Sequence, residues 1–227
     1  EVGIRNTTLR RDASISEEEL LALIAELNAD DDVDGILVQL PLPRHIDENK
    51  VISAISVDKD VDGFHPLNVA RLWLKQPCVL PCTPKGIIKL LKSAEIEISG
   101  KEAVVIGRSN IVGLPVAKLL TDENATVTVA HSRTRNLAEV TRRADILVVA
   151  IGRERFVTAD MVKPGAVVID VGVNRDSRTG KLCGDVDFEA CQDIASYITK
   201  TPGGVGPMTI ACLMENTVEC FLKRMDK

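Results

Sequence analysis

Aliphatic runs and helix-like segments alternate along the second half of the chain. The runs are short and rich in valine and isoleucine, which is typical of strands buried inside a parallel sheet. Segments with helical or loop character separate them, among them a helix predicted over 136–143. The alternation predicts a right-handed parallel α/β sheet, with strands over 104–106, 126–130, 146–151, 167–171 and 197–198.

The first part of the chain carries a weaker α/β pattern. Ser14 or Ser16 is expected to cap a predicted helix over 17–28, and Glu19 follows Ser16 by three residues, as in a capping box. An apolar run over 35–40 predicts a buried strand that ends at Pro41. This part is also predicted to hold a strand over 3–9, with its start near Val2, and a helix over 48–55.

A proline-rich joint and a glycine-rich loop flank the second half. Residues 81–84 read as the joint, and Thr83 is expected to cap a helix that has Pro84 at its first position. An apolar helix is predicted over 208–224, directly after the loop 201–207. Such a loop permits close approach of the backbone to a flat ligand, or a flexible joint between domains, and spacing alone favours neither.

Composition narrows the class of protein. The chain has 227 residues, of which 45% are hydrophobic and only 3% aromatic, so the core is aliphatic. A net charge of -5 argues against a nucleic-acid or anionic-membrane partner, and no apolar run approaches the roughly 20 residues of a membrane helix. The six cysteines form no C-x-x-C, which predicts reduced cytoplasmic thiols rather than zinc. The acidic loop that begins at Asp58 has Val69 where a calcium loop needs glutamate, so no metal site is expected.

A glycine turn follows the aliphatic run 104–106. Gly107 ends the run, and Gly113 precedes a helical pattern. Strand, glycine turn and helix form the layout of a phosphate-binding βα turn. The usual G-x-G-x-x-G is broken because Ser109 occupies the place of its second glycine, so the pattern alone is weak.

The next predicted strand ends on basic and hydroxyl residues. An NAD site has an acidic residue there for the ribose 2′-hydroxyl, whereas residues 129–135 contain none and include Ser132 and Arg133. Guanidinium and hydroxyl donors suit the oxygens of a 2′-phosphate, and Arg108 in the glycine turn has the reach to join them. Each arginine alone is more often a solvated loop residue, but their coincidence predicts NADP rather than NAD. Val173, after the run 167–171, is a candidate to offer backbone groups to the nicotinamide amide.

Two polar residues of the first part are candidates for chemistry. Gln39 interrupts an apolar run, where a buried amide needs partners. Asp62 is a carboxylate beside Gly63. Taken alone, each is more often structural than catalytic.

Five motifs together make the sequence resemble one family. The motifs lie in order at 35–43, 59–63, 81–84, 107–115 and 202–209. Their order is similar to that of the bifunctional methylenetetrahydrofolate dehydrogenase/methenyltetrahydrofolate cyclohydrolase family, over essentially the whole chain. The resemblance implies a Rossmann-like NADP-binding domain over 83–207. It also implies a smaller α/β catalytic domain over 1–82 and 208–227, completed by the C-terminal helix, with a folate cleft between the two domains.

The resemblance also implies two reactions of one-carbon metabolism. NADP⁺ oxidises 5,10-methylenetetrahydrofolate to the 5,10-methenyl cation, and water opens that cation to 10-formyltetrahydrofolate. Gln39 and Asp62 would be the catalytic candidates, and a cytoplasmic homodimer is expected. The implied dinucleotide contacts are Gly107, Arg108, Ser109, Ser132, Arg133 and Val173. The implied folate contacts are Val38, Gln39, Leu40, Asp62, Pro202 and Gly203.

One feature of the family is absent from the sequence. Its Tyr-x-x-x-Lys pair stands just upstream of the segment that matches residues 1–4, and the only tyrosine here is Tyr197. We therefore expect a catalytic domain that is incomplete at its N-terminus. A non-catalytic NADP-binding module is the alternative. A shikimate-type dehydrogenase, a third option, is disfavoured by the motifs at 35–43 and 202–209.

Overall fold

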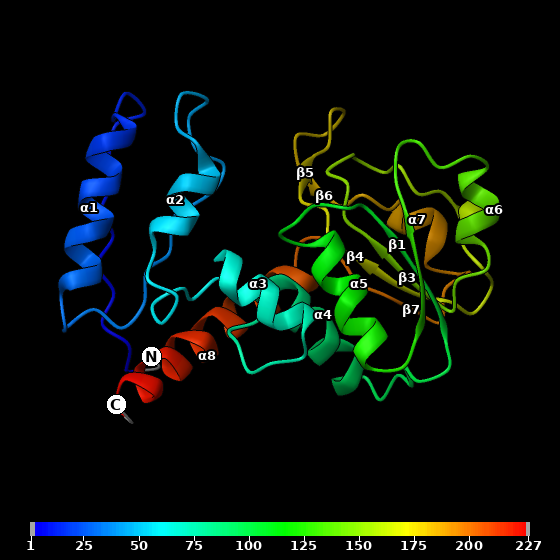
Figure 1. Cartoon of the computed structure of the whole chain (residues 1–227). Helices are drawn as coiled ribbons and strands as arrows, with labels where there is room; N and C mark the ends of the chain where they lie inside the picture. The colour runs from blue at the N-terminus through cyan, green and yellow to red at the C-terminus, as the bar shows by residue number, and fades with distance from the viewer. Residues whose placement is uncertain (1–2, 226–227) are drawn as a thin grey trace.

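The computed structural model describes residues 3–225 and has an α/β architecture (Figure 1). A five-stranded sheet with its helices forms one end of the molecule, and helices α1 and α2 lie at the other. Helices α3, α4 and α8 lie between them. No described helix is long and apolar enough to cross a membrane.

The sheet is wholly parallel, and its strand order is β2-β1-β3-β4-β7. The chain moves outward from β1 to β2 and then returns to place β3 on the other side of β1. The carboxyl ends of β1 and β3 therefore flank the topological switch point, where open α/β sheets bind ligands. This confirms the predicted sheet, whose strands are β1 (Glu102–Ile106), β2 (Thr126–Ala130), β3 (Ile146–Val149), β4 (Val167–Asp170) and β7 (Tyr197–Ile198).

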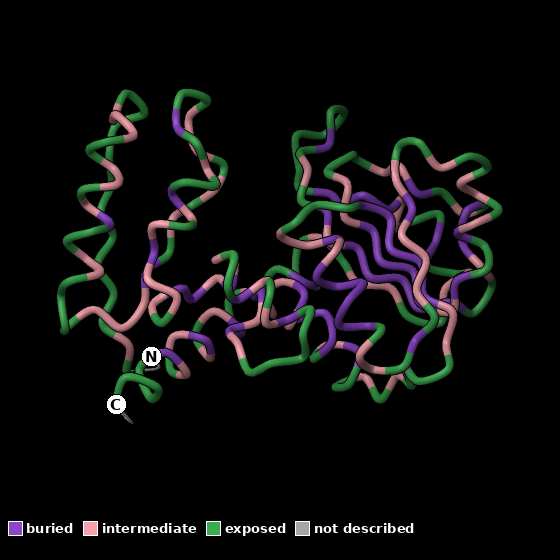
Figure 2. Tube along the Cα trace, viewed as in Figure 1, coloured by how far each residue is buried: buried purple, intermediate pink, exposed green. Residues whose placement is uncertain are grey.

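Aliphatic cores cover both faces of the sheet (Figure 2). One core includes residues of α4 (Cys82–Ser93) and α5 (Gly113–Asp122). The other includes residues around α6 (Leu137–Thr141) and α7 (Phe188–Cys191). The helix predicted over 136–143 is thus correct but shorter. Sequence patterns missed α7, the 3-10 helix at Ala159–Met161 and the hairpin of β5 (Asn174–Arg175) and β6 (Leu182–Cys183).

The first part has a small core of its own, which includes Ile24, Ile36 and Val51. Helix α1 (Glu17–Ala29) confirms the prediction, and both hydrogen bonds of the Ser16–Glu19 capping box are present. Helix α2 (Glu48–Ala54) also forms, and α3 (Pro66–Trp73) was not predicted.

Both strands predicted in this first part are wrong. Residues 3–9 form no strand and are mostly exposed, while Val2 lies outside the described residues. In 35–40 only Ile36 pairs, through a single parallel bridge to Asp60. Alternation and apolar runs reveal which segments suit a strand, but a strand also needs a neighbour to pair with, and no neighbouring strand lies along either segment among residues 3–225.

Helices α4 and α8 (Val205–Met225) join the two ends of the molecule. Asn216 of α8 is fully buried, and its amide nitrogen donates to the carbonyl oxygens of Val61 and Leu80, each at 2.9 Å. Its amide oxygen accepts a bond from Lys85 Nζ at 2.8 Å. One side chain of α8 therefore ties α4 to the backbone of the first part.

The start of α4 corrects one prediction. The helix begins at Cys82 after Pro81, and no side chain caps it. Thr83 lies inside its first turn, and the Thr83 hydroxyl is 2.9 Å from the hydroxyl of Thr209 on α8. A threonine before a proline resembles a cap in sequence, but here its hydroxyl serves helix packing instead.

Candidate functional site

The turn after β1 needs both of its glycines. Gly107 has a φ of 124°, and a β-carbon there would overlap the carbonyl oxygen of Ala150. A β-carbon on Gly113 would overlap the backbone of Gly107. The Ser109 hydroxyl accepts bonds from the amides of Val112 and Gly113, each at 3.2 Å. Ser109 therefore holds the first turn of α5, which explains a serine where the usual motif has glycine.

The predicted phosphate-binding side chains lie at one edge of the sheet. Ile106 pairs with Ala130, so the loops after β1 and β2 leave the sheet side by side. These loops carry Arg108, Ser132 and Arg133, which are all exposed. Among residues 3–225, neither guanidinium has an ion-pair partner. Unpaired basic donors beside a turn that a β-carbon would block fit a phosphorylated ribose and a pyrophosphate.

The loops after β3 and β4 close the other side of this edge. Val173 follows β4, the strand next to β3, and is 66% exposed. Two buried carboxylates, Asp170 and Asp185, accept hydrogen bonds from the backbone of these loops. Sequence reasoning missed both. The sequence signal for Asp170 was its place at the end of an otherwise aliphatic run, two residues before Gly172.

The glycine-rich loop lies against the loop after β4. The hydroxyl of Thr201 donates to the carbonyl oxygen of Gly172 at 3.1 Å. Pro202 and Gly203 follow directly, are exposed and precede α8. The structure thus brings the predicted folate loop next to the predicted nicotinamide loop.

Asp62 lies where α4 meets the first part of the chain. Burial raises the pKa of its carboxyl to about 6, the negative charge of Asp60 adds to the rise, and a hydrogen bond with Cys82 opposes it. Asp60 itself is buried and accepts bonds from backbone amides of the following turn, including His65 at 2.8 Å, and from the Asn68 side chain. Asp60 is therefore structural, whereas the carboxylate of Asp62 remains available to bind a ligand.

Gln39 is exposed, and its amide nitrogen donates to the carbonyl oxygen of Leu40 at 3.0 Å. The prediction that this amide is buried is wrong. The parallel bridge of Ile36 with Asp60 aligns the two segments, so residues 38–40 and Asp62 leave it in the same direction. Val38 and Leu40 are half-buried.

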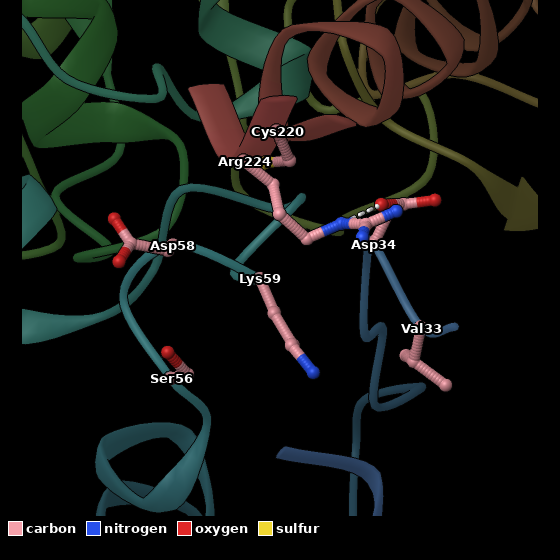
Figure 3. Close-up of a pocket in the computed structure, with 7 residues that line it drawn as sticks. All are labelled: Val33, Asp34, Ser56, Asp58, Lys59, Cys220 and Arg224. Carbon is pink, nitrogen blue, oxygen red and sulfur yellow. Dashed lines mark hydrogen bonds and ion pairs between the residues drawn. The ribbon is translucent and has the colours of Figure 1, made fainter. Parts of the chain in front are cut away.

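A separate hollow lies at the far end of α8 (Figure 3). Arg224 donates to Asp34 there at 2.6 Å. Lys59 donates to the carbonyl oxygens of Leu27, Asn28 and Asp30 at the end of α1, which satisfies the open end of that helix. The hollow contains none of the predicted site residues, and its polar groups serve the fold.

These features define a class of protein. An open parallel sheet carries a glycine turn, unpaired arginines and an acid-free strand end at its switch point, as a dinucleotide-binding domain does. A second, helical unit lies on the other side of α4 and α8, with a carboxylate at the junction.

Comparisons with known proteins identify the family. The model of the tetrahydrofolate dehydrogenase/cyclohydrolase catalytic domain matches residues 1–62, and that of the family's NAD(P)-binding domain matches residues 81–225. The chain belongs to the tetrahydrofolate dehydrogenase/cyclohydrolase family.

Relatives resemble the chain over nearly its whole length. The bifunctional protein FolD of Streptococcus pneumoniae is 61% identical over 225 residues, which cover 99% of this chain and 79% of the relative. The corresponding protein of Geobacillus thermodenitrificans is 62% identical over 96% of this chain and 77% of its own length.

Solved structures of enzymes with these names also resemble the chain. The bifunctional enzyme FolD of Campylobacter jejuni is 54% identical, with a TM-score of 0.90 over 93% of this chain and 75% of its own. The Trypanosoma brucei enzyme, solved as a complex with NADP cofactor and inhibitor, is 40% identical, with a TM-score of 0.93 over 99% of this chain and 79% of its own.

Proposed function

We propose that this chain oxidises 5,10-methylenetetrahydrofolate to 5,10-methenyltetrahydrofolate with NADP⁺ and hydrolyses the product to 10-formyltetrahydrofolate. The observation that carries the proposal is the identity of about 60% with bifunctional FolD proteins, which extends through both domains. It is a bifunctional enzyme of folate one-carbon metabolism, and its cofactor is NADP.

The cofactor is held by the edge of the sheet at the switch point. Gly107 lets the backbone approach the pyrophosphate, and Ser109 fixes the turn so that its remaining amides face the ligand. Arg108, Ser132 and Arg133 donate to the 2′-phosphate, which their exposure and lack of ion pairs support. Val173 meets the nicotinamide end. When bound, NADP⁺ accepts the hydride from the methylene carbon of the folate.

The folate lies at the junction of the two units. Asp62 accepts hydrogen bonds from the polar edge of the pterin, and this role is supported by its position beside α4 and by the absence of a cationic partner among residues 3–225. Gln39 orients polar groups near the reacting carbon but cannot titrate. The backbone of Val38 and Leu40 and the loop at Pro202 and Gly203 line the remainder of the folate site.

The oxidation step needs little acid–base catalysis from the protein. The carbon that loses hydride stands between two nitrogens, so the product cation is stabilised by the folate itself, and the protein's task is alignment. The Thr201–Gly172 hydrogen bond supports such alignment, because it connects the folate loop to the cofactor loop. Hydration of the cation needs a positioned water and a proton acceptor, which in the family is assigned to the lysine of the Tyr-x-x-x-Lys pair.

The proposal includes three further expectations, which concern the domain boundaries, the oligomeric state and the cellular location. The domain boundaries are 1–82 with 208–227, and 83–207. Val205 at the start of α8 packs in the core of the sheet, while Cys220 near its end packs against Val61, which supports a break within the first turn of α8. The protein is a homodimer, as the family resemblance implies. It works in the cytoplasm, which its six unpaired cysteines support.

Reduction of NADP⁺ by 5,10-methylenetetrahydrofolate, followed by absorbance, tests the activity. The assay uses a chain in which the family's Tyr-x-x-x-Lys segment precedes Glu1, and a lysine-to-methionine variant of that segment controls for the hydrolysis step. Turnover supports the proposal, and its absence in a folded protein refutes it. Calorimetry on the 227-residue chain separates the alternative, since a non-catalytic module binds NADP but neither binds nor turns over folate.

A further inference from the structure

Two buried carboxylates stand at the cofactor edge of the sheet without a cation beside them. Asp170 is the last residue of β4 and is 3% exposed, and Asp185 follows β6 and is 0% exposed. Neither forms an ion pair with any side chain of residues 3–225. Hydrogen bonds from neutral groups stabilise their charges instead, and a buried carboxylate is costly unless such bonds are complete.

Asp185 holds the loop that follows β3. Its carboxylate accepts bonds from three successive backbone amides, those of Ile151, Gly152 and Arg153, at 2.7, 3.0 and 2.7 Å. The side-chain amide of Asn174 donates to it at 2.8 Å. The loop is therefore wrapped around one carboxylate, and its conformation depends on that charge.

Asp170 holds the loop that follows β4 and also holds Asp185. Its carboxylate accepts bonds from the amides of Gly172 at 3.0 Å, Asp185 at 2.9 Å and Val186 at 3.0 Å. The amide of Asp170 in turn donates to the hydroxyl of Thr199, just before the glycine-rich loop. The two aspartates form one brace through which the loops after β3 and β4 are connected.

Glycines make room for each carboxylate. A β-carbon on Gly172 would overlap the carboxylate of Asp185, and one on Gly184 would overlap that of Asp170. Neither glycine has a positive φ, so the need at both positions is for space rather than for backbone freedom. The arrangement is reciprocal, since each aspartate packs on the glycine that neighbours the other's loop.

We propose that Asp170 and Asp185 are positioning residues for the dinucleotide. They fix the loop after β3, which flanks the switch point, and the neighbouring loop after β4, which carries Val173, the residue assigned above to the nicotinamide end. The inference rests on the proposed function. It goes beyond a role in stability because the loop after β3 leaves the sheet at the switch point between β1 and β3, where an open α/β sheet binds its ligand.

The test compares Asp185→Asn with Asp60→Asn. Asp60 is also buried, at 1% exposed, and accepts bonds from the three backbone amides of residues 63–65 and from the Asn68 side chain, but these lie in the first part of the chain. Each substitution replaces a carboxylate oxygen, which accepts hydrogen bonds, by an amide nitrogen, which cannot. Both variants are therefore expected to have a lower melting temperature. Only Asp185→Asn should weaken NADP binding, by about tenfold or more in calorimetry, since several charge-assisted bonds are lost.

Asn174→Ala keeps the proposal testable if Asp185→Asn does not fold. It removes a single donor to Asp185 and should weaken NADP binding by a few-fold, about 2 to 5. NADP affinities of the folded Asp185 and Asn174 variants that match the wild type, or an equal loss in Asp60→Asn, would overturn the proposal. Wild-type protein that binds no NADP would instead overturn the proposed function, so the two failures are distinguishable.

Discussion

The hydroxyl of Thr201 donates to the carbonyl oxygen of Gly172, at 3.1 Å. Thr201 opens the glycine-rich loop that precedes α8, and Gly172 lies in the loop after β4. This bond is a direct connection between the segment proposed to line the folate and the segment proposed to meet the nicotinamide. Its length and the half-buried position of Thr201 make it a defined link rather than a chance surface contact.

Replacement of Thr201 by valine should slow the oxidation while leaving each ligand's affinity nearly unchanged. The side chain keeps its shape but loses the donor, so the two loops are less well aligned for hydride transfer. A lost neutral hydrogen bond is worth about 1 kcal/mol, which corresponds to a fall in kcat of roughly fivefold. Stopped-flow single-turnover rates measure this directly. Thr201→Ser retains the hydroxyl and should keep most of the rate, and a serine variant as slow as the valine variant would argue against the hydrogen bond.

Much of the fold could be predicted from the sequence. The central strands β1, β3 and β4 lie in short aliphatic runs, because strands buried on both faces are apolar nearly throughout. The Ser16–Glu19 capping box marked the start of α1 correctly. The strand over 35–40 failed because pairing is a property of two segments, and Ile36 found only Asp60 as a partner. Very short elements such as β5 and β6 leave too few residues to show any period.

Parts of the proposed site have local signals in the sequence. The acid-free end of β2 and the turn at Gly107 carried local signals, because phosphate recognition uses consecutive residues near one strand end. The brace of Asp170 and Asp185 could not be recognised, since the carboxylates and the amides they hold come from separate loops. The family resemblance pointed to Asp62, but its raised pKa depends on burial by α4 and on Asp60, which only the folded chain brings together.

Arg108→Ala should weaken NADP binding by one to two orders of magnitude and NAD binding by about twofold or less. The guanidinium has no ion-pair partner in the described chain, so its free donors are available to the 2′-phosphate, which NAD lacks. Isothermal calorimetry with both cofactors measures the difference. Arg143→Ala is the matched control, because Arg143 pairs with Glu102 at the opposite end of β1. Equal losses for NADP and NAD would show that Arg108 does not read the phosphate.

Asn216→Ala should destabilise the chain by about 3 kcal/mol. The substitution leaves the carbonyl oxygens of Val61 and Leu80 without their donor and Lys85 without one of its acceptors, all in a buried setting. Urea unfolding followed by circular dichroism gives the change in unfolding free energy. Asn49 is exposed on α2, and Asn49→Ala should stay within about 0.5 kcal/mol of wild type. A similarly small change for Asn216→Ala would mean that α4 and α8 are held together by other contacts.

The raised pKa of Asp62 should make stability and folate affinity change in opposite directions with pH. Burial, helped by the negative charge of Asp60, raises the folded pKa of Asp62 to about 6, above its ordinary value of 3.8. Between these two values the folded state binds more protons than the unfolded state, so stability falls as pH rises through the window. Over roughly two pKa units this amounts to at most about 3 kcal/mol. Asp170 contributes with the same sign, since burial also raises its pKa to about 6.

Asp62→Asn isolates the Asp62 share, because it removes one carboxyl with a raised pKa and leaves the other, that of Asp170, in place. Urea unfolding at pH 4 and pH 7 should show a smaller loss of stability in the variant than in the wild type. Folate binding should follow the opposite course, since only the ionised carboxylate can accept two hydrogen bonds from the pterin edge. The Michaelis constant for 5,10-methylenetetrahydrofolate should therefore rise as the pH falls below about 6 in the wild type. In Asp62→Asn it should be high and nearly independent of pH, while NADP affinity is preserved in both. A binding carboxylate with a pKa of about 6 changes its charge between pH 5 and pH 7, so the wild-type Michaelis constant must change over this range. A Michaelis constant that stays the same would show that Asp62 is not part of the folate site.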